Sequence, residues 1–559
     1  MLLATPARAA VERLTYTVPV TQPDEFGQPV SLDTDVYRPG TASLHPMVML
    51  FHGGGSDKSN PYDSSHAAQL AEHGYVVILY SARGHGASGG QTTVIGPKEI
   101  RDLFDVAAWS MGIGGRDTPP HPDFGIDPSR IALAGYSQGG LHTNLGQAHS
   151  ADPALNPYGI RFRALLPGNT PDYTFQALVQ NGVIKLSYGV GLLETYLVGA
   201  HAHVSPLLGK WVAALSADQP ALAGGELCDY SQHDTATSTV KQDLAFRSPG
   251  CFMAQMTPPS LWAQAFDDAL FPPQMAISMW QRMPSPDKSL YLSMGGHAAP
   301  AAPQAVEDDK FTEQVAFLDR LLQPAGASPG RQPPVVYWRR DPRVQVPADS
   351  YRYPDAAWSR HTSPSWPPPG TSGTSLQLGA NGTAVPAGAQ AGPKPLAPFN
   401  TDPANDPVAT AAFSSTPLGT SPIPSKVPTL QLPGFLAGFE TAPYARDREL
   451  SGSPRASLTW TPLSPDTQLV VKLLDRAADG TLTLLSRGVT GIRGAAPGAP
   501  TQVPVPLNAF SALVPAGHSL VTWVSAGDAA FYKPFVPSLG GVLGAGPGST
   551  VTLPLGRAR

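Results

Sequence analysis

Three short segments carry side chains that could together cleave an acyl bond. Gly135-Tyr136-Ser137-Gln138-Gly139 fits the pattern Gly-x-Ser-x-Gly, two acids stand at Asp267 and Asp268, and His297 follows two glycines. A serine hydroxyl becomes a good nucleophile when a histidine takes its proton and a carboxylate orients that histidine. We therefore predict that Ser137 attacks a carbonyl carbon, that His297 is the base and that Asp268 orients His297.

Two other serines fit the same five-residue pattern, Ser88 and Ser328. A nucleophilic serine of this kind sits on a sharp turn between a strand and a helix. Ser137 follows the apolar run 131–134 and precedes a segment with helical character, 141–146. Ser88 lies well past its strand, and Ser328 lies in a Pro/Gly-rich stretch. The local context favours Ser137 and predicts that the other two are loop residues.

The choice of histidine and acid depends on position relative to predicted strands. His297 comes just after an apolar run, whereas His361 and His518 lie in a later β-rich region. The acid should follow the strand before that run, where Asp267 and Asp268 are adjacent. Successive side chains of an extended loop point apart, so one faces the histidine. We predict Asp268, with Asp267 as the alternative.

An anionic intermediate needs N–H donors around its oxygen. The segment Phe51-His52-Gly53-Gly54-Gly55 follows an apolar run, at the place where such a loop belongs. We predict the N–H of Gln138 as one donor and the N–H of Gly54, or of Gly53, as the other. His142, shortly after Ser137, is predicted to be a packing residue.

Composition excludes several other functions. The chain has 559 residues, a net charge of −5 and 14% charged residues, and no run of Lys or Arg marks a nucleic-acid site. No apolar stretch reaches the 18 residues or more that a membrane helix needs. Nucleotide-binding and zinc-binding patterns are missing from the sequence. We expect no cofactor, no metal and a small ester or peptide substrate. The oligomeric state stays open.

The elements that must position these residues form an α/β pattern. Apolar runs at 48–51, 75–80, 131–134 and 289–292 alternate with helical patterns at 67–73, 100–111 and 311–322, as in a parallel sheet with crossover helices. Mixed segments at about 165–255 predict an inserted helical cap. Short alternating strands, such as 457–460 and 468–474, predict an all-β sandwich or jelly roll.

These patterns divide the chain into a catalytic and a C-terminal domain. We predict a catalytic domain over 11–324, a linker over 325–335 and a β domain over 336–559, in which 379–428 is a surface excursion. Residues 1–10 end in small residues and resemble the remnant of a secretory signal, which predicts a secreted or periplasmic protein. In such a compartment Cys228 and Cys251 could pair, and two separate thiols are the alternative.

The motifs resemble those of the X-prolyl dipeptidyl peptidase and cocaine esterase group of serine hydrolases, the peptidase S15 or CocE/NonD family. The segments that carry the resemblance lie at 52–56, 74–77, 83–90, 135–140, 268–272, 296–297, 439–443, 449–454 and 475–480. Ser81 departs from the family pattern, which often has an aspartate there. Many members also use a tyrosine hydroxyl as an oxyanion donor, for which Tyr62 is the nearby residue.

The resemblance implies an α/β-hydrolase with a helical cap and a jelly-roll-like C-terminal domain that walls the active site. It implies cleavage of an ester or an X-Pro peptide through an acyl-enzyme. A peptidase of this kind must hold a free amino group with carboxylates, and no such pair is evident, Glu194 and Asp229 being unsupported positions. The alternative function is an inactive hydrolase fold that uses its β domain to bind carbohydrate or a partner protein.

Overall fold

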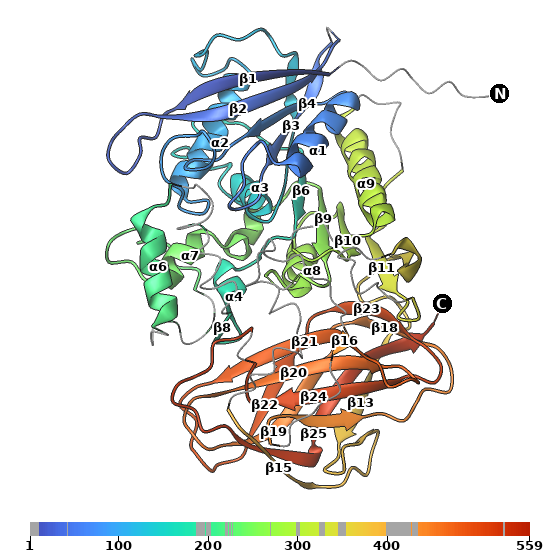
Figure 1. Ribbon diagram of the computed structural model, residues 1–559. Coiled ribbons are helices and arrows are strands. Elements are labelled where there is room, and N and C mark those ends of the chain that lie inside the picture. Colours follow the sequence, from blue (N-terminus) through green and yellow to red (C-terminus); the bar gives the residue numbers. More distant parts are fainter. Residues whose placement is uncertain are drawn as a thin grey trace, which may run out of the picture.

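The structure is a computed structural model, shown in Figure 1. It describes residues 11–41, 43–185, 196, 203–217, 222, 225, 227–268, 270–297, 302–323, 330–344, 354–398, 426–427, 434–528 and 531–558. The predicted signal remnant at 1–10, Ser328 and Glu194 lie outside the described residues, as do residues 325–329 of the predicted linker.

A mainly parallel sheet forms the centre of the N-terminal half. Its strands, in spatial order, are β1 (Val11–Val20), β2 (Val30–Pro39), β4 (Val76–Tyr80), β3 (His45–Phe51), β5 (Ile126–Tyr136), β6 (Ala164–Gly168), β9 (Ser260–Ala265), β10 (Lys288–Ser293) and β11 (Val335–Arg340). From β4 to β11 all neighbours are parallel. The strands β3, β4 and β6 are buried along their full length, as a sheet covered on both faces requires.

Helices cover both faces of this sheet. Helices α1 (Pro61–Glu72) and α9 (Gln304–Leu322) lie together on one face, where Tyr75 donates a hydrogen bond to Asp319 at 2.6 Å. Helices α2 (Pro97–Ser110) and α3 (Gln138–Ala148) pack against each other on the other face (Figure 1). The parallel sheet with crossover helices confirms the predicted α/β class.

The cap segment contributes helices between β6 and β9. They are α4 (Thr174–Leu178), α6 (Pro206–Ser216), α7 (Val240–Phe246) and the 3₁₀ segment η3 (Pro249–Gln255), with the short hairpin β7 (Val179–Gln180) and β8 (Val183–Ile184). Phe175, Leu208, Trp211 and Leu244 share a small apolar core of their own. The cap is therefore a packed unit with its own interior.

The C-terminal half is built from two sheets that face each other. One contains β13 (Ser372–Leu378), β15 (Gly392–Leu396), β18 (Arg448–Gly452), β19 (Arg455–Pro462), β22 (Thr501–Pro506), β23 (Phe510–Val514) and β25 (Gly541–Arg557). The other contains β16 (Lys426–Val427), β21 (Leu482–Ile492), β20 (Thr467–Arg476), β24 (Ser519–Ser525) and β17 (Ala437–Glu440). Leu458 and Val503 of the first sheet and Leu469 of the second share one buried cluster.

The two halves are joined by strand pairing as well as by the chain itself. Strand β11 pairs with β10 of the hydrolase sheet, with β12 (Trp358–Ser363), and at Arg340 with Ala512 of β23. Hydrogen-bonded strands therefore run from the catalytic half into the C-terminal half. The predicted surface excursion at 379–428 is only partly described, and its segment β15 pairs with β25 inside the sheet.

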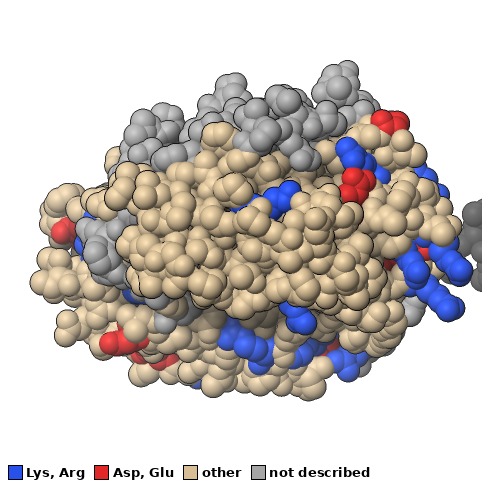
Figure 2. Space-filling model, turned by 90° about the horizontal axis from the view of Figure 1, so that it is seen from below, with Lys and Arg blue, Asp and Glu red and all other residues tan. Residues whose placement is uncertain are grey.

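The underside of the C-terminal half carries few charged side chains. Figure 2 shows this face as mostly uncharged, with Lys and Arg seen mainly along its lower and right-hand edges. The low charged fraction of the whole chain, 14%, is consistent with this surface. Among the described helices, none is long and apolar enough to cross a membrane.

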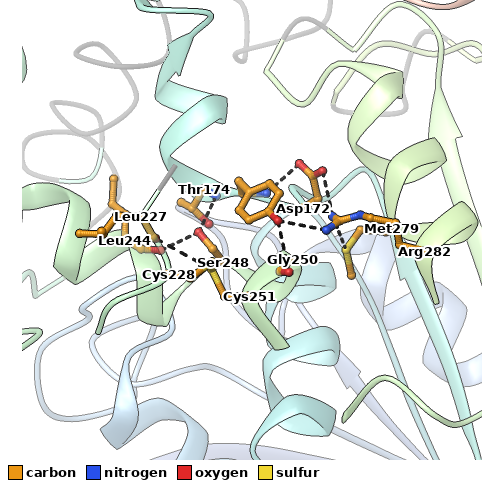
Figure 3. Close-up of a disulfide and its surroundings, with 11 residues drawn as sticks. Asp172, Thr174, Leu227, Cys228, Leu244, Ser248, Gly250, Cys251, Met279 and Arg282 are labelled. Carbon is orange, nitrogen blue, oxygen red and sulfur yellow. Dashed lines mark hydrogen bonds and ion pairs between the residues drawn. A yellow bond between two sulfur atoms is a disulfide. The ribbon is translucent and has the colours of Figure 1, made fainter. Parts of the chain in front are cut away.

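A disulfide between Cys228 and Cys251 ties the cap together. Cys251 lies in η3 and Cys228 precedes α7, 23 residues earlier in the chain. Figure 3 shows this disulfide and its surroundings. The segment η3 is also held by Asp172, whose carbonyl accepts a hydrogen bond from the N–H of Gly250 at 2.8 Å. The pairing left open by the sequence is thus present, and it encloses α7.

We predict that removing this disulfide lowers stability without abolishing folding. A crosslink that closes a loop of this length contributes about 3 kcal/mol, mainly by restricting the unfolded chain. The double variant Cys228→Ser/Cys251→Ser should therefore unfold at a lower temperature in calorimetry. Reduction of the unmodified protein should reproduce the decrease, and an unchanged midpoint in both samples would contradict the prediction.

Candidate active site

Ser137 occupies the turn between β5 and α3. Its backbone has φ 58° and ψ −123°, a strained conformation for a residue with a side chain. The turn is held because the N–H of Ser137 donates to the carbonyl of Gly168 at the end of β6, at 2.9 Å. Gly139 is needed in the next turn because a Cβ there would overlap the carbonyl of Phe51.

His297 and Asp268 meet Ser137 in one hydrogen-bonded chain. Nε2 of His297 lies 2.7 Å from Oγ of Ser137, and Nδ1 of His297 lies 2.9 Å from Oδ2 of Asp268. His297 follows β10 and Asp268 follows β9, and these are neighbouring parallel strands. Their carboxyl ends lie at one edge of the sheet, which brings together residues 29 positions apart.

The two adjacent acids have different partners. The carboxylate of Asp268 is fully buried, and its Oδ1 accepts hydrogen bonds from the N–H groups of Leu270 at 2.9 Å and Phe271 at 2.8 Å. Oδ1 of Asp267 instead accepts from the N–H groups of Gly295 at 3.1 Å and Gly296 at 2.9 Å. Asp268 thus contacts the imidazole, whereas Asp267 holds the backbone that leads to it.

Burial also distinguishes Asp267. Desolvation raises the pKa of Asp267 to about 7, an effect that the two glycine N–H donors oppose. At neutral pH the Asp267 carboxyl is therefore protonated, and so uncharged, in a large fraction of the molecules. Such a group is suited to bracing a loop and poorly suited to stabilising a positive imidazole.

Asn169 is a site residue that sequence reasoning missed. Its Oδ1 accepts from the N–H of Ala265 at 2.9 Å, and its Nδ2 donates to the carbonyls of Gly296 at 3.3 Å and His297 at 3.4 Å. It therefore links the end of β9 to the histidine loop. The signal available in the sequence was its position just after the apolar run 164–168, at the same sheet edge as Ser137.

The glycine loop after β3 lies beside the serine. A Cβ built on Gly53 would be 3.8 Å from Cβ of Ser137, and Gln138 begins α3. His52 braces this loop: Nε2 accepts from the N–H of Ala82 at 2.8 Å while Nδ1 contacts the carbonyl of Gly53 at 2.8 Å. Burial lowers the pKa of His52 to about 3, so its ring is neutral.

Two tyrosines clarify where a phenolic donor could act. Tyr62 donates to Glu307 of α9 at 3.4 Å, and its ring packs on Tyr136, so its hydroxyl points to the α1–α9 layer. Tyr196 of the cap instead donates to the side-chain oxygen of Gln138. A Cβ at Gly54 would overlap the Tyr196 hydroxyl. The phenol at the glycine loop is therefore that of Tyr196.

The remaining residues singled out by the sequence have structural environments. Ser88 is buried, donates to the carbonyl of Ser81 at 2.6 Å and accepts from the N–H of Asp33 at 2.9 Å. His142 stacks on Phe51, and burial lowers its pKa to about 3. Both serve as packing and loop residues, as predicted. His361 and His518 lie in the C-terminal half, where His518 contacts Asp475 at 2.8 Å.

The arrangement can perform nucleophilic acyl transfer. A serine at a strand–helix turn contacts a histidine that contacts a buried carboxylate, beside glycine N–H groups and the N-terminus of a helix. Within the described residues, no cluster of His, Cys, Asp or Glu is arranged to hold a metal ion. Fold and site define a serine hydrolase of the α/β-hydrolase type.

Comparison with family models gives the particular family. A model described as X-Pro dipeptidyl-peptidase (S15 family) matches residues 27–299, and one described as the X-Pro dipeptidyl-peptidase C-terminal non-catalytic domain matches residues 328–540. The chain belongs to this S15 family of hydrolases. Family membership supports an ester or a peptide bond as the target of hydrolysis. No curated protein matches the sequence at a significant level.

Solved structures share the complete fold at low sequence identity. An aminopeptidase from the marine sediment archaeon Thaumarchaeota archaeon is 14% identical, with a TM-score of 0.69 over 99% of this chain and 98% of that one. A CocE/NonD family hydrolase from Staphylococcus aureus is 14% identical, with a TM-score of 0.66 over 98% and 97%. An alpha-amino acid ester hydrolase is 14% identical, with a TM-score of 0.67 over 99% and 98%.

We predict that Asp268→Asn and Asp267→Asn differ strongly in hydrolytic rate. Loss of the carboxylate that orients a catalytic histidine lowers kcat about 10⁴-fold. Asp267→Asn keeps an oxygen acceptor for the glycine N–H groups and should lower kcat far less. Steady-state kinetics on an activated ester, with circular dichroism as a folding control, measures both. Equal losses in two folded variants would contradict this division of roles.

Proposed function

We propose that this protein is an acyl hydrolase in which Ser137 is the nucleophile, His297 the general base and Asp268 the orienting acid. The observation that carries the proposal is the unbroken contact from Oγ of Ser137 through both ring nitrogens of His297 to Asp268. Ser137 attacks the substrate carbonyl while Nε2 of His297 takes the hydroxyl proton. His297 then returns that proton to the leaving group.

The intermediate formed by this attack carries a negative oxygen. We assign its stabilisation to the N–H of Gln138, at the positive end of α3, and to the N–H of Gly54 or Gly53. A Cβ built on Gly53 would lie 3.8 Å from Cβ of Ser137, which supports a location of this loop within reach of the reacting carbon. Water, activated by the same His297, then releases the acyl group from Ser137.

We propose a neutral ester as the substrate. The rings of Phe271 and His297 form a T-shaped contact with centroids 5.1 Å apart, which favours an uncharged group beside the histidine. Asp172 is opposite Arg282 at 3.5 Å, and Asp229 is exposed and accepts from Ser231. Neither carboxylate is poised to receive a substrate ammonium. The X-Pro peptide is the second candidate, favoured by the family model.

We further propose that the protein acts in an oxidising compartment, outside the cytosol. The disulfide between Cys228 and Cys251 supports this, because such bonds persist mainly in secreted and periplasmic proteins.

An activity-based probe tests the nucleophile. A fluorophosphonate should label one serine, and peptide mapping should find the adduct on Ser137. Ser137→Ala should abolish labelling and ester hydrolysis, because Oγ of Ser137 lies 2.7 Å from a histidine that also contacts a buried carboxylate. Ser88→Ala is the matched control and should still be labelled. Absence of labelling in the folded wild-type protein would favour the inactive binding protein.

A paired assay tests the substrate. We expect turnover of p-nitrophenyl butyrate and little turnover of Ala-Pro-p-nitroanilide, because a carboxylate pair for the free amino group is not evident among the described residues. A dipeptide amide cleaved faster than the ester, and only with an unblocked N-terminus, would overturn the ester assignment. It would leave the assignment of Ser137, His297 and Asp268 intact.

A further inference from the structure

Lys185 is a fully buried lysine at the junction of three parts of the molecule. It follows β8 of the cap hairpin, and its exposed fraction is 0%. Around it lies an apolar cluster drawn from the cap, from the loop after β9 and from the C-terminal half: Ala177, Val183, Leu270, Phe271, Met275, Val470, Val489, Phe531, Tyr532 and Phe535. A lysine is seldom fully buried, because removing an ammonium from water is costly.

The ammonium of Lys185 contacts the same peptide group that contacts Asp268. Nζ of Lys185 donates to the carbonyl of Leu270 at 2.7 Å. The N–H on the other side of that peptide bond, from Phe271, donates to Oδ1 of Asp268 at 2.8 Å. A cation at a carbonyl oxygen polarises the peptide and strengthens its N–H as a donor. One planar peptide therefore connects Lys185 to the carboxylate that faces His297.

The C-terminal half holds Lys185 in this position. Residue Lys185 forms a β-bridge with Tyr532, and the N–H of Lys533 donates to the carbonyl of Ile184 at 2.8 Å. On the cap side, the N–H of Lys185 donates to the carbonyl of Leu178 at 3.0 Å. The backbone of Lys185 is thus held on both sides, and its side chain reaches the loop after β9 that carries Asp268 and Leu270.

Burial and two nearby charged groups shift the pKa of Lys185 in opposite directions. Burial lowers the pKa of Lys185 to about 7, Asp268 raises it, and Arg487 of β21 lowers it further. The folded protein therefore binds fewer protons at this site than the unfolded chain between pH 7 and the ordinary range of lysine. In its charged form the buried lysine therefore opposes folding. A residue that served stability alone would not do so, which favours a role at the site.

We propose that Lys185 is a positioning residue of the catalytic site, which fixes and polarises the Leu270–Phe271 peptide so that Asp268 remains aimed at His297. The inference rests on the proposed function of Ser137, His297 and Asp268. It also assigns the C-terminal half a part in catalysis, because Tyr532 and its neighbours seal the lysine from water.

The test compares variants that separate charge from packing. Lys185→Met keeps most of the length of the side chain and removes the ammonium, and Lys185→Gln keeps a neutral N–H donor. Val183→Ala is the matched control, because it loosens the same hairpin and apolar cluster without touching the ammonium. Each full-length variant is assayed for kcat and KM on p-nitrophenyl butyrate, for the pH profile of kcat/KM and for the melting temperature.

We expect Lys185→Met to lower kcat at least about tenfold, the usual effect of losing a hydrogen bond to a charged group, with KM changed less than about threefold. Lys185→Gln should fall between Lys185→Met and the wild type. The acid limb of the Lys185→Met profile should move to higher pH, because one positive charge near the imidazole is gone. The melting temperature of Lys185→Met should not fall, since methionine suits an apolar environment and the charged lysine opposes folding.

Three results would overturn the proposal. They are a kcat of Lys185→Met within about threefold of the wild type, a loss confined to KM, or an equal loss of kcat in Val183→Ala. If Lys185→Met does not fold, Lys185→Gln answers the same question. Failure of the proposed function is distinguishable, because wild-type enzyme would then resist fluorophosphonate and hydrolyse neither substrate.

Discussion

The strained backbone of Ser137 is the constraint on which the site depends. A residue with a side chain at φ 58° costs roughly 1–3 kcal/mol, and surrounding contacts must hold it there. The carbonyl of Gly168 does so from β6, and Gly139 lets α3 approach Phe51 closely. Because these contacts come from three neighbouring parallel strands, the serine geometry requires an intact central sheet. The hydroxyl then lies at the sheet edge where the loops that carry His297 and Asp268 also lie.

The sheet and the position of Ser137 at a turn between a strand and a helix could be predicted because both depend on local patterns. The apolar run 48–51 lies in β3, and the run 131–134 lies in β5. Both runs predicted strands because a strand buried on both faces needs a continuous apolar sequence. The preference for Asp268 over Asp267 rested on weaker grounds. Which of two adjacent acids faces the histidine depends on how the turn after β9 is held, and that is determined by long-range contacts.

Other residues could not be found from the sequence for the same reason. Asn169 and Lys185 act through carbonyl and N–H groups of distant segments, and any sequence could supply those groups. Tyr196 reaches Gly54 from the cap, whereas the sequence pointed to Tyr62 because it was close along the chain. Proximity in sequence predicts partners within a loop, but the partners here are brought together by packing between separate units.

Strand β11 makes the catalytic sheet depend on the C-terminal half for a covered edge. It belongs to the catalytic sheet through β10 and reaches the C-terminal half through β12 and β23. A chain shortened after the catalytic half would leave β11 with an open edge, and unpaired strand edges promote aggregation. The C-terminal half therefore acts as an edge cover for the hydrolase sheet. Such a cover explains, in terms of solubility, why a catalytic unit would retain a β sandwich even when the sandwich carries no chemistry.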